Sequence, residues 1–463
     1  MTTARRVMML EFNELSPLLM NRFMAEGNLP NFQRLHDESQ VYVTEAAERG
    51  WELNPWVQWV TVHSGLDYRC HGITELDEGG DLKAKRVWDV VSEAGLPVWV
   101  CGSMNVAYHA PLNGLMMPDP WTTKIAPQPD TLQPFFRFVQ QNVLDHSKDS
   151  VPLARADYLS FLKFMLGHGL SFRTVKAILQ QLLSERSHDQ DQHWKRAVLL
   201  DKLQFDVFSW YYRKTQPHFS TFFSNSTAHY QHYYWREMEP DLFKIRPTDE
   251  QRSTHEAAIL FGYQEMDKMI ARFLKLAGPE TIVVFATAIS QQPCLAYEEQ
   301  GGKVIYRPRE LAQLMKFADI TEPHTVAPVM AEVFNVHLRS EKDAESVEAK
   351  LRALQADGRL AMQVQRKGTV VNAKCLLNEQ LDAGTTISRN GSSQVVPFFD
   401  LFYQIEDIKS GMHHPDGMFW IRMPDKRHRR EEGRVALASV APTLLGLLSL
   451  PCPAHMDARP IAV

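Results

Sequence analysis

The sequence predicts an α/β protein in which a mostly parallel sheet is flanked by helices and interrupted by a helical insertion. A buried strand over residues 7–12 is followed by helices and a second strand over 41–44, and this alternation continues to residue 102. Bulky helical segments replace the alternation between residues 130 and 214. The alternation then returns with a strand over 219–224, as expected if the same sheet continues after the interruption.

The ends of the early elements support this prediction. Ser16 stands at an N-cap position, Pro17 occupies the first helical position, and Gly27 follows the last apolar residue of the first helix. A later helix over 86–94 leads directly into a strand over 98–102. Short connections of this kind, from helix to strand, are typical of a parallel sheet.

The length of 463 residues allows two or three domains, or one large α/β domain that carries an insertion. We expect an α/β core made of residues 1–129 and 215–463, with a helical insertion or cap over 130–214. The later part of the core is expected to contain strands over 219–224, 281–286 and 418–423, strand-like residues over 361–374, and helices over 250–276, 309–317, 325–334, 341–354 and 435–448.

Composition excludes several classes of protein. With 44% hydrophobic and 23% charged residues the chain is globular, and a formal charge of −5 argues against nucleic-acid binding. The five cysteines are scattered singly, which is typical of reduced thiols in the cytoplasm. The longest apolar stretch, near residues 435–450, is broken by Pro442, so we expect no membrane insertion. The oligomeric state is not indicated by the sequence.

Two histidine motifs carry the strongest local chemistry. His229 and His232 lie three residues apart after a strand, a spacing that suits paired metal ligands or a catalytic base with its orienting partner. The alternative is two histidines hydrogen-bonded within an aromatic cluster. His413, His414 and Asp416 form a polar loop before a late strand, which suits a metal or phosphate site but also an ordinary turn.

Further polar residues follow the predicted strands at their carboxyl ends, where open α/β sheets bind ligands. They are Glu11, Asn13 and Glu14 after the first strand, Asn225, His229 and His232 after another, and Thr287, Gln291 and Gln292 after a third. Amides, histidines and carboxylates suit the binding of a polar small molecule, sugar-like or phosphorylated, with histidine as general acid or base. The alternative is that polar residues collect at loop ends in any α/β protein.

Several ordered segments together resemble the alkaline phosphatase superfamily, in its type I phosphodiesterase/nucleotide pyrophosphatase branch. They cover nearly the whole chain: Val7-Met-Met-Leu-Glu-Phe-Asn13, Glu26-Gly-Asn-Leu-Pro-Asn-Phe-Gln-Arg-Leu35, Trp59-Val-Thr61-Val-His-Ser64-Gly65 with His71-Gly72-Ile73, Ala228-His-Tyr-Gln-His232-Tyr-Tyr-Trp235, His413-His-Pro-Asp-Gly417 and Ala441-Pro-Thr-Leu-Leu-Gly446. The resemblance implies an alkaline-phosphatase-like parallel-rich sheet, two divalent metal ions and a Ser or Thr nucleophile.

The chain departs from the family at most of these catalytic positions. The first metal-binding aspartate corresponds to Asn13, the nucleophile falls near Pro55, and a further aspartate corresponds to Ala228. The later Ser-Asp-His-Gly segment is replaced by Ala286-Thr287-Ala288-Ile289. Of the family's ligands, His232 and His413 remain, and the resemblance implies that both serve the same metal ion.

We therefore predict that the standard two-metal mechanism is absent, because a second divalent cation would lack carboxylate ligands. One zinc or manganese ion could still bind to His232 and His413, provided that His229, His414 or Asp416 completes the set.

Two functional hypotheses follow. In the first, the protein is a divergent hydrolase or group-transfer enzyme acting on a phosphorylated or sugar-like small molecule. His232 and His413 would lie at its centre, His229 and Glu11 beside them, and Thr61 or Ser64 would replace the nucleophile. The alternative is a non-hydrolytic pseudoenzyme that binds a phosphorylated ligand, or a protein partner through the helical insertion.

Overall fold

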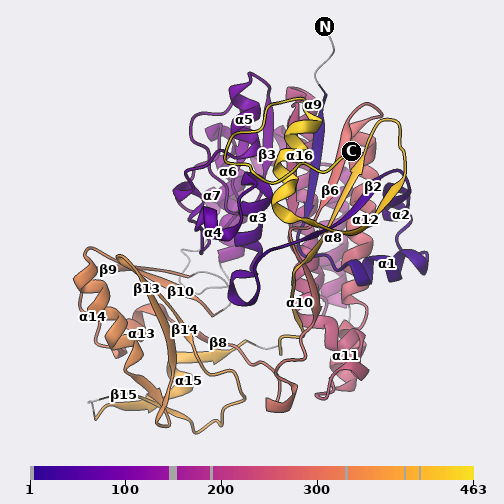
Figure 1. The fold of residues 1–463 in the computed structure, drawn as a ribbon. Coiled ribbons are helices and arrows are strands. Elements are labelled where there is room, and N and C mark those ends of the chain that lie inside the picture. Colours follow the sequence, from indigo (N-terminus) through magenta and orange to yellow (C-terminus); the bar gives the residue numbers. More distant parts are fainter. Residues whose placement is uncertain (1–4, 145–153, 188–190, 329–331, 391–392, 406–407) are drawn as a thin grey trace.

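The computed structural model describes residues 5–144, 154–187, 191–328, 332–390, 393–405 and 408–463. Figure 1 shows a larger α/β unit that contains both termini of the chain and a smaller unit formed by a segment of the second half. None of the helices within the described residues is long and apolar enough to cross a membrane.

A mostly parallel sheet forms the centre of the larger unit. Strand β19 (Asp416–Arg422) runs antiparallel to its neighbours β2 (Gln40–Glu45) and β6 (Ile282–Ala286), while the other strand pairs of this sheet are parallel. Within the described residues the strands follow the order β20 (Arg429–Ala436), β2 (Gln40–Glu45), β19 (Asp416–Arg422), β6 (Ile282–Ala286), β1 (Val7–Phe12), β5 (Phe219–Ser224), β3 (Val98–Cys101) and β4 (Gly114–Met117). The predicted fold class, a parallel-rich sheet flanked by helices, is confirmed.

Both faces of this sheet are covered, and each has its own hydrophobic core. Along β1, Met8 and Leu10 point into one core and Val7 and Met9 into the other, because side chains alternate along a strand. The first core is closed by α1 (Pro17–Ala25), α2 (Pro30–Asp37), α9 (Ala197–Thr215), α10 (Ser226–Met238) and α12 (Ala258–Ala277). The second is closed by α3 (Pro55–Ser64), α5 (Val87–Glu93) and α16 (Val440–Leu447). Two short helices, α4 (Tyr68–His71) and α11 (Asp249–His255), lie at the periphery.

The predicted insertion over 130–214 is helical, but it packs into the main core. It contains α6 (Gln133–Leu144), α7 (Arg155–Gly167), α8 (Phe172–Ser187) and α9. Phe135, Phe164 and Trp194 belong to the same hydrophobic cluster as the sheet, and Phe208 of α9 stacks on Trp99 of β3 with ring centroids 6.1 Å apart. These helices therefore cover the sheet directly and share its core.

A separate hydrophobic cluster lies in the smaller unit, which the sequence analysis included in the α/β core. Its members Phe334, Val336, Leu351 and Val371 are fully or almost fully buried. The strands of this unit are β8 (Tyr306–Pro308), β9 (His324–Pro328), β10 (Phe334–Leu338), β11 (Leu354–Ala356), β12 (Arg359–Leu360), β13 (Met362–Lys367), β14 (Val370–Cys375), β15 (Thr386–Arg389), β16 (Val395–Pro397) and β17 (Phe402–Gln404), and its helices are α13 (Leu311–Phe317), α14 (Glu341–Arg352) and α15 (Phe398–Leu401).

The helix predicted over 325–334 is wrong for the residues described there. Thr325 and Val326 belong to β9, which pairs with β10, and residues 329–331 lie outside the described residues. β-Branched side chains favour this pairing over a helix.

A two-stranded ribbon connects the two units. Strands β7 (Ser290–Pro293) and β18 (Gly411–His414) pair antiparallel, with Gln291 opposite His413. β7 follows β6 and β18 precedes β19, so the ribbon extends from the central sheet. The same two chain segments come together again where Lys303 forms a bridge with Lys409. The ribbon therefore brings residues distant in sequence to the carboxyl end of the sheet.

Candidate functional site

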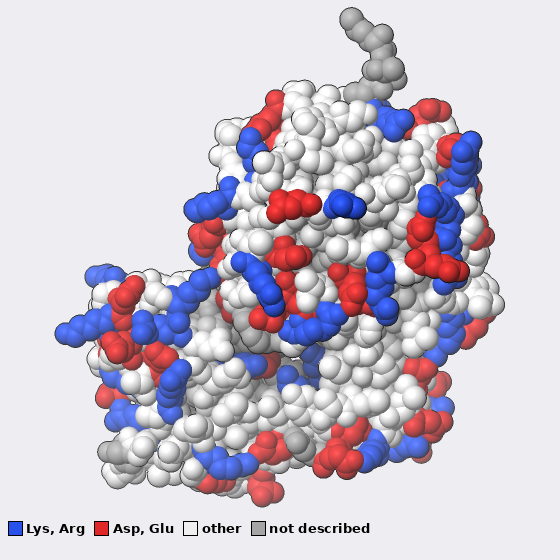
Figure 2. Space-filling model, viewed as in Figure 1, with Lys and Arg blue, Asp and Glu red and all other residues white. Residues whose placement is uncertain are grey.

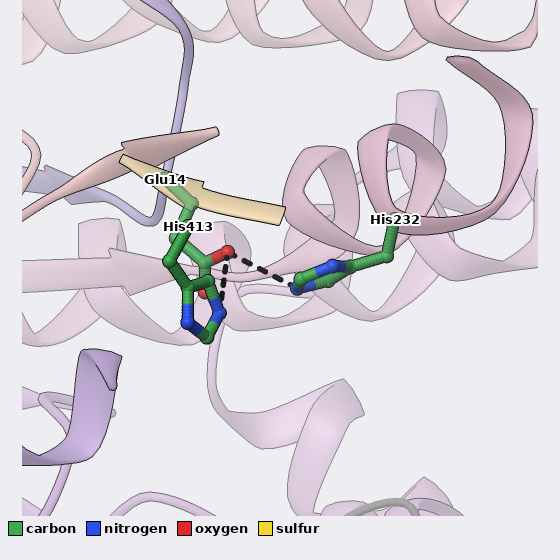
Figure 3. Close-up of side chains that lie close together, drawn as sticks. All are labelled: Glu14, His232 and His413. Atoms are coloured by element: carbon green, nitrogen blue, oxygen red, sulfur yellow. Dashed lines mark ion pairs between the residues drawn. The ribbon is translucent and has the colours of Figure 1, made fainter. Parts of the chain in front are cut away.

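Three side chains from three different elements meet at the carboxyl end of the sheet (Figure 3). Glu14 follows β1 in the left-handed conformation, with φ of 59°. His232 projects from α10, which begins directly after β5, and His413 comes from β18 of the ribbon. Because β1 and β5 are parallel neighbours, their carboxyl ends lie together, and this places Glu14 close to α10.

The distances in this group are short. His232 Nε2 lies 3.1 Å and His413 Nε2 lies 3.4 Å from the same oxygen, Glu14 Oε2. The potential ligand atoms of all three lie within 4.8 Å of one another. In the described part of the chain, no other group of three or more His, Cys, Asp or Glu side chains meets this condition. The Glu14 side chain is 2% exposed, against 20% for His232 and 17% for His413, so an approaching ligand would meet the imidazoles first.

Hydrogen bonds hold the Glu14 carboxylate in place. Gln291 Nε2 donates to Oε2 at 2.6 Å, Asn13 Nδ2 donates to Oε1 at 2.8 Å, and Gln231 Nε2 donates to the backbone carbonyl of Glu14 at 2.7 Å. Burial by itself raises the pKa of Glu14, but His413, His232 and the hydrogen bonds lower it to about 2. The carboxylate is therefore ionised at neutral pH.

Each imidazole is oriented by a backbone group on its other side. His232 Nδ1 lies 3.3 Å from the carbonyl oxygen of Gly411, and His413 hydrogen-bonds to the backbone of Leu53. Burial lowers the pKa of His413 to about 3, although the charge of Glu14 acts in the opposite direction. His413 is therefore neutral at neutral pH, and its Nε2 faces the carboxylate.

A glycine allows the ribbon to approach α10 this closely. A Cβ atom at Gly411 would lie 2.5 Å from Gln291 Oε1 and closer still to the backbone carbonyl oxygen of Gln231. Ser410 N also donates to the carbonyl oxygen of His232 at 2.8 Å. The position of His413 thus depends on direct backbone contact between β18 and α10.

Two predicted amides lie next to the cluster. Asn13 Nδ2 donates to Asn225 Oδ1 at 2.8 Å, and Trp59 Nε1 donates to Asn13 Oδ1 at 2.8 Å. Asn13 and Gln291 therefore contact Glu14 directly, and Asn225 is linked to it through Asn13.

Other predicted ligands are not brought together with His232 and His413. His229 is exposed on α10 and packs on Tyr233, with ring centroids 4.9 Å apart. His414 Nδ1 accepts a hydrogen bond from the backbone N–H of Asp416 at 3.2 Å. The Asp416 carboxylate pairs with Arg434, whose Nε lies 2.8 Å from Oδ1. Since neighbouring residues of a strand point to opposite faces, His413 and His414 cannot both reach the cluster.

Three residues predicted to take part in catalysis bond elsewhere. Glu11 Oε1 lies 2.9 Å from His63 Nε2, and both side chains are buried between β1 and α3. Thr61 Oγ1 lies 3.3 Å from His71 Nε2, and Ser64 Oγ donates to a carbonyl oxygen of its own helix. The contacts of Glu11 and Thr61 fix α3 against β1 and α4, whereas the Ser64 bond lies within α3.

The last two predicted binding residues lie along the ribbon and the adjoining sheet. Thr287 Oγ1 accepts from Met418 N at 2.8 Å, and Gln292 is half-buried opposite Met412.

The start of α3 lies beside the cluster without offering a hydroxyl group. Pro55 occupies its first position, after the N-cap residue Asn54, and the backbone of the preceding Leu53 contacts His413. Pro55, the position near which the sequence analysis expects the nucleophile of the resembled family, thus lies two residues after Leu53, whose backbone contacts His413.

Sequence reasoning assigned Glu14 to substrate binding and did not include it among the metal ligands. Its position directly after Asn13 was the available signal, because the two residues occupy the same strand end. The lysines Lys303 and Lys409, which lie at the base of the ribbon, were not singled out either.

The comparisons with known proteins yield structures of similar fold. The chain is similar to human ectonucleotide pyrophosphatase/phosphodiesterase 5, with a TM-score of 0.44 and 10% identity over 97% of this chain and 96% of that one. It is also similar to the murine protein of that name in complex with AMP, with a TM-score of 0.43, 12% identity and coverage of 97% and 96%. A third similar structure is phosphonoacetate hydrolase from Sinorhizobium meliloti 1021 in complex with phosphonoacetate. Its TM-score is 0.42 and its sequence identity 12%, over 96% of this chain and 95% of that one. No family model and no curated protein matches the sequence.

Proposed function

We propose that Glu14, His232 and His413 bind one divalent metal ion, zinc or manganese, and that the protein is an enzyme acting on a phosphate-bearing small molecule. The observation that carries this proposal is the arrangement of the three side chains around Glu14 Oε2. A neutral imidazole, oriented from behind by a backbone group, faces a carboxylate across 3.4 Å. A cation between such electron-rich groups would be favourable.

The donor set fits this ion. Two imidazoles and one carboxylate suit zinc or manganese and leave coordination positions open for a substrate or water. Hydrogen bonds to the outer nitrogen of a histidine and to a ligating carboxylate are typical of metal centres, and here they come from Gly411, Leu53 and Gln291. Bound there, the metal ion would act as a Lewis acid and lower the pKa of water.

A second metal ion has no comparable set of ligands in the described residues. Asn13 Oδ1 already accepts from Trp59, and position 228 is an alanine. The start of α3 also offers Pro55 in place of a hydroxyl side chain. We therefore propose that the reaction proceeds without a second metal ion and without a covalent Ser or Thr intermediate.

Two lysines favour an anionic substrate. Lys303 and Lys409 oppose each other across a strand bridge, and no carboxylate of the described residues lies within ion-pair distance of either. Burial and the neighbouring Lys303 lower the pKa of Lys409, and Lys409 acts electrostatically on His413. Figure 2 shows charged side chains of both signs inside the hollow between the two units. A phosphate group near the metal ion would offset the repulsion between the lysines.

The proposed roles of the chain's own groups follow from these contacts. Gln291 and Asn13 would keep Glu14 ionised and fixed, and the lysines would orient the phosphate. The linked amides Asn13 and Asn225 would hydrogen-bond the polar remainder of the substrate, consistent with a sugar-like or nucleotide-like group. The five cysteines are free, which supports the further proposal that the protein works in the reducing cytoplasm.

Elemental analysis of the protein purified without chelator tests the metal site. We expect about one equivalent of zinc or manganese in the wild type and its loss in His232→Ala and His413→Ala. His229→Ala is the matched control, because it removes an exposed histidine from the same helix, and it should keep the metal. Equal metal content in all four proteins would refute the assignment.

Hydrolysis of p-nitrophenyl phosphate and bis-p-nitrophenyl phosphate then tests the activity. Turnover that requires the metal and survives Thr61→Val and Ser64→Ala supports the enzyme. A protein that binds one metal ion and these phosphates without turnover would be a binding protein, which was the alternative raised by the sequence.

A further inference from the structure

A second basic feature lies at the other end of the central sheet. An open cavity of about 460 Å³ is formed by α8, α9, α12 and the residue before β1. Its lining contains five cationic side chains: Arg6, Arg173, Arg213, Arg272 and Lys275. Arg6 precedes β1 and Glu14 follows it, so roughly 20 Å of strand separates this cavity from the candidate metal site.

The positive charge of this cavity is poorly balanced. Asp206 is the carboxylate of the lining, and its Oδ1 lies 3.1 Å from Arg272 while its Oδ2 accepts from Ser171 N. Arg173, Arg213 and Lys275 are exposed and have no carboxylate of the described residues within ion-pair distance. Burial, together with the charges of Arg173 and Arg213, lowers the pKa of Arg272 despite its pairing with Asp206.

Stabilisation of helix ends accounts for part of this cluster only. Arg213 and Lys275 lie in the last turns of α9 and α12, where a cation interacts favourably with the helix dipole. Arg173 lies in the first turn of α8, where the dipole disfavours a cation. Arg6 lies outside any helix and donates to Gln216 Oε1 at 2.6 Å. The convergence of these elements on one cavity therefore needs another reason.

We propose that this cavity binds a phosphate-bearing anion, at a site separate from the candidate metal centre. Arginine guanidinium groups match phosphate oxygens in geometry and charge. The phosphate could belong to a free small molecule or to a lipid headgroup. Beside Arg173, Phe172 is 81% exposed, and Leu166 at the end of α7 is 70% exposed. Apolar and cationic side chains in this arrangement also suit the surface of an anionic membrane.

Calorimetric titration with inorganic pyrophosphate tests the site. The cavity variant replaces Arg173, Arg213 and Lys275 by Gln, and its matched control replaces three exposed lysines elsewhere, Lys83, Lys316 and Lys342. We expect the cavity variant to lose affinity by on the order of a hundredfold and the control to stay within about threefold of the wild type. The double variant His232→Ala with His413→Ala should keep this binding, which separates it from any binding at the metal site.

Sedimentation with vesicles distinguishes the sources of the phosphate. Wild-type protein that sediments with phosphatidylcholine vesicles containing phosphatidic acid, but not with phosphatidylcholine alone, supports a lipid headgroup when the cavity variant stays in solution. Binding of pyrophosphate alone supports a free ligand. The proposal is overturned if the wild type binds neither probe, or if the cavity variant, shown to be folded by circular dichroism, binds both as well as the control does.

Discussion

Replacement of Gly411 by alanine should destabilise the protein and loosen the candidate metal site together. The new Cβ would lie 2.5 Å from Gln291 Oε1 and closer to the backbone carbonyl oxygen of Gln231, and neither contact is tolerable. The Gln231 carbonyl belongs to α10 and cannot move without the helix. Gln291 cannot turn away without breaking its hydrogen bond to Glu14.

The cost follows from this overpacking. Insertion of one methyl group into a tightly packed site costs about 1–3 kcal/mol. The backbone conformation at residue 411 does not lie in the left-handed region, so the whole cost is steric. If β18 moves away from α10, His413 Nε2 moves away from Glu14, and we expect metal affinity to fall by about tenfold or more.

Urea unfolding of metal-free protein measures the first effect, and competition with a chromophoric chelator measures the second. Gly446→Ala is the matched control, because residue 446 lies in α16, where nothing beyond the helix's own backbone comes within 4 Å of the added methyl group. There the same substitution should stabilise the protein by up to about 1 kcal/mol. If Gly411→Ala keeps the stability and metal affinity of the wild type, the proposed contact between ribbon and helix does not position His413.

Three further predictions concern the surroundings of the cluster. In the metal-free protein the folded-state pKa values of His413 and Glu14 lie below their ordinary values, so the unfolded chain takes up more protons than the folded chain as pH falls. The stability contributed by His413 is therefore lost from about pH 6.5 toward 3, and that contributed by Glu14 from about pH 4.5 toward 2. His413→Gln should therefore reduce the slope of unfolding free energy against pH between about 6.5 and 4.5 by up to about 1.4 kcal/mol per pH unit, and an unchanged slope in urea titrations would contradict this. Trp59→Phe removes the donor to Asn13 Oδ1 and should cost about 1 kcal/mol in urea unfolding; no loss would mean that the amide network does not depend on it. Lys303→Met with Lys409→Met should raise KM for a phosphate ester by about tenfold or more with metal content unchanged, whereas an unchanged KM would remove the lysines from substrate binding.

The class of fold was predictable because it depends on local periodicity. The buried strand over 7–12 and the helix ends at Pro17 and Gly27 are encoded by neighbouring residues. The smaller unit was not predictable in this way. Its strands and helices have the same local character as those of the larger unit, and its independence depends on long-range packing around Phe334 and Leu351.

The candidate site, too, was predictable from the sequence only in part. His232 and His413 were found from motifs, and Asn13, Asn225 and Gln291 from their positions after strands. The metal-binding role that we propose for Glu14 depends on a left-handed backbone turn and on the ribbon, which brings His413 next to Glu14 although the two residues lie almost 400 positions apart. For the same reason His414, next to His413 in sequence, could not be excluded from the cluster before the pairing of β18 with β7 was known.

The most direct measurement of the central claim is a crystal structure with anomalous diffraction recorded at the zinc and manganese absorption edges. Our account predicts one anomalous peak bonded to Glu14 Oε2, His232 Nε2 and His413 Nε2, at about 2.0–2.2 Å from each. A metal-replete crystal without a peak at this position, or with a peak bonded to His229 or His414 in its place, would contradict the assignment.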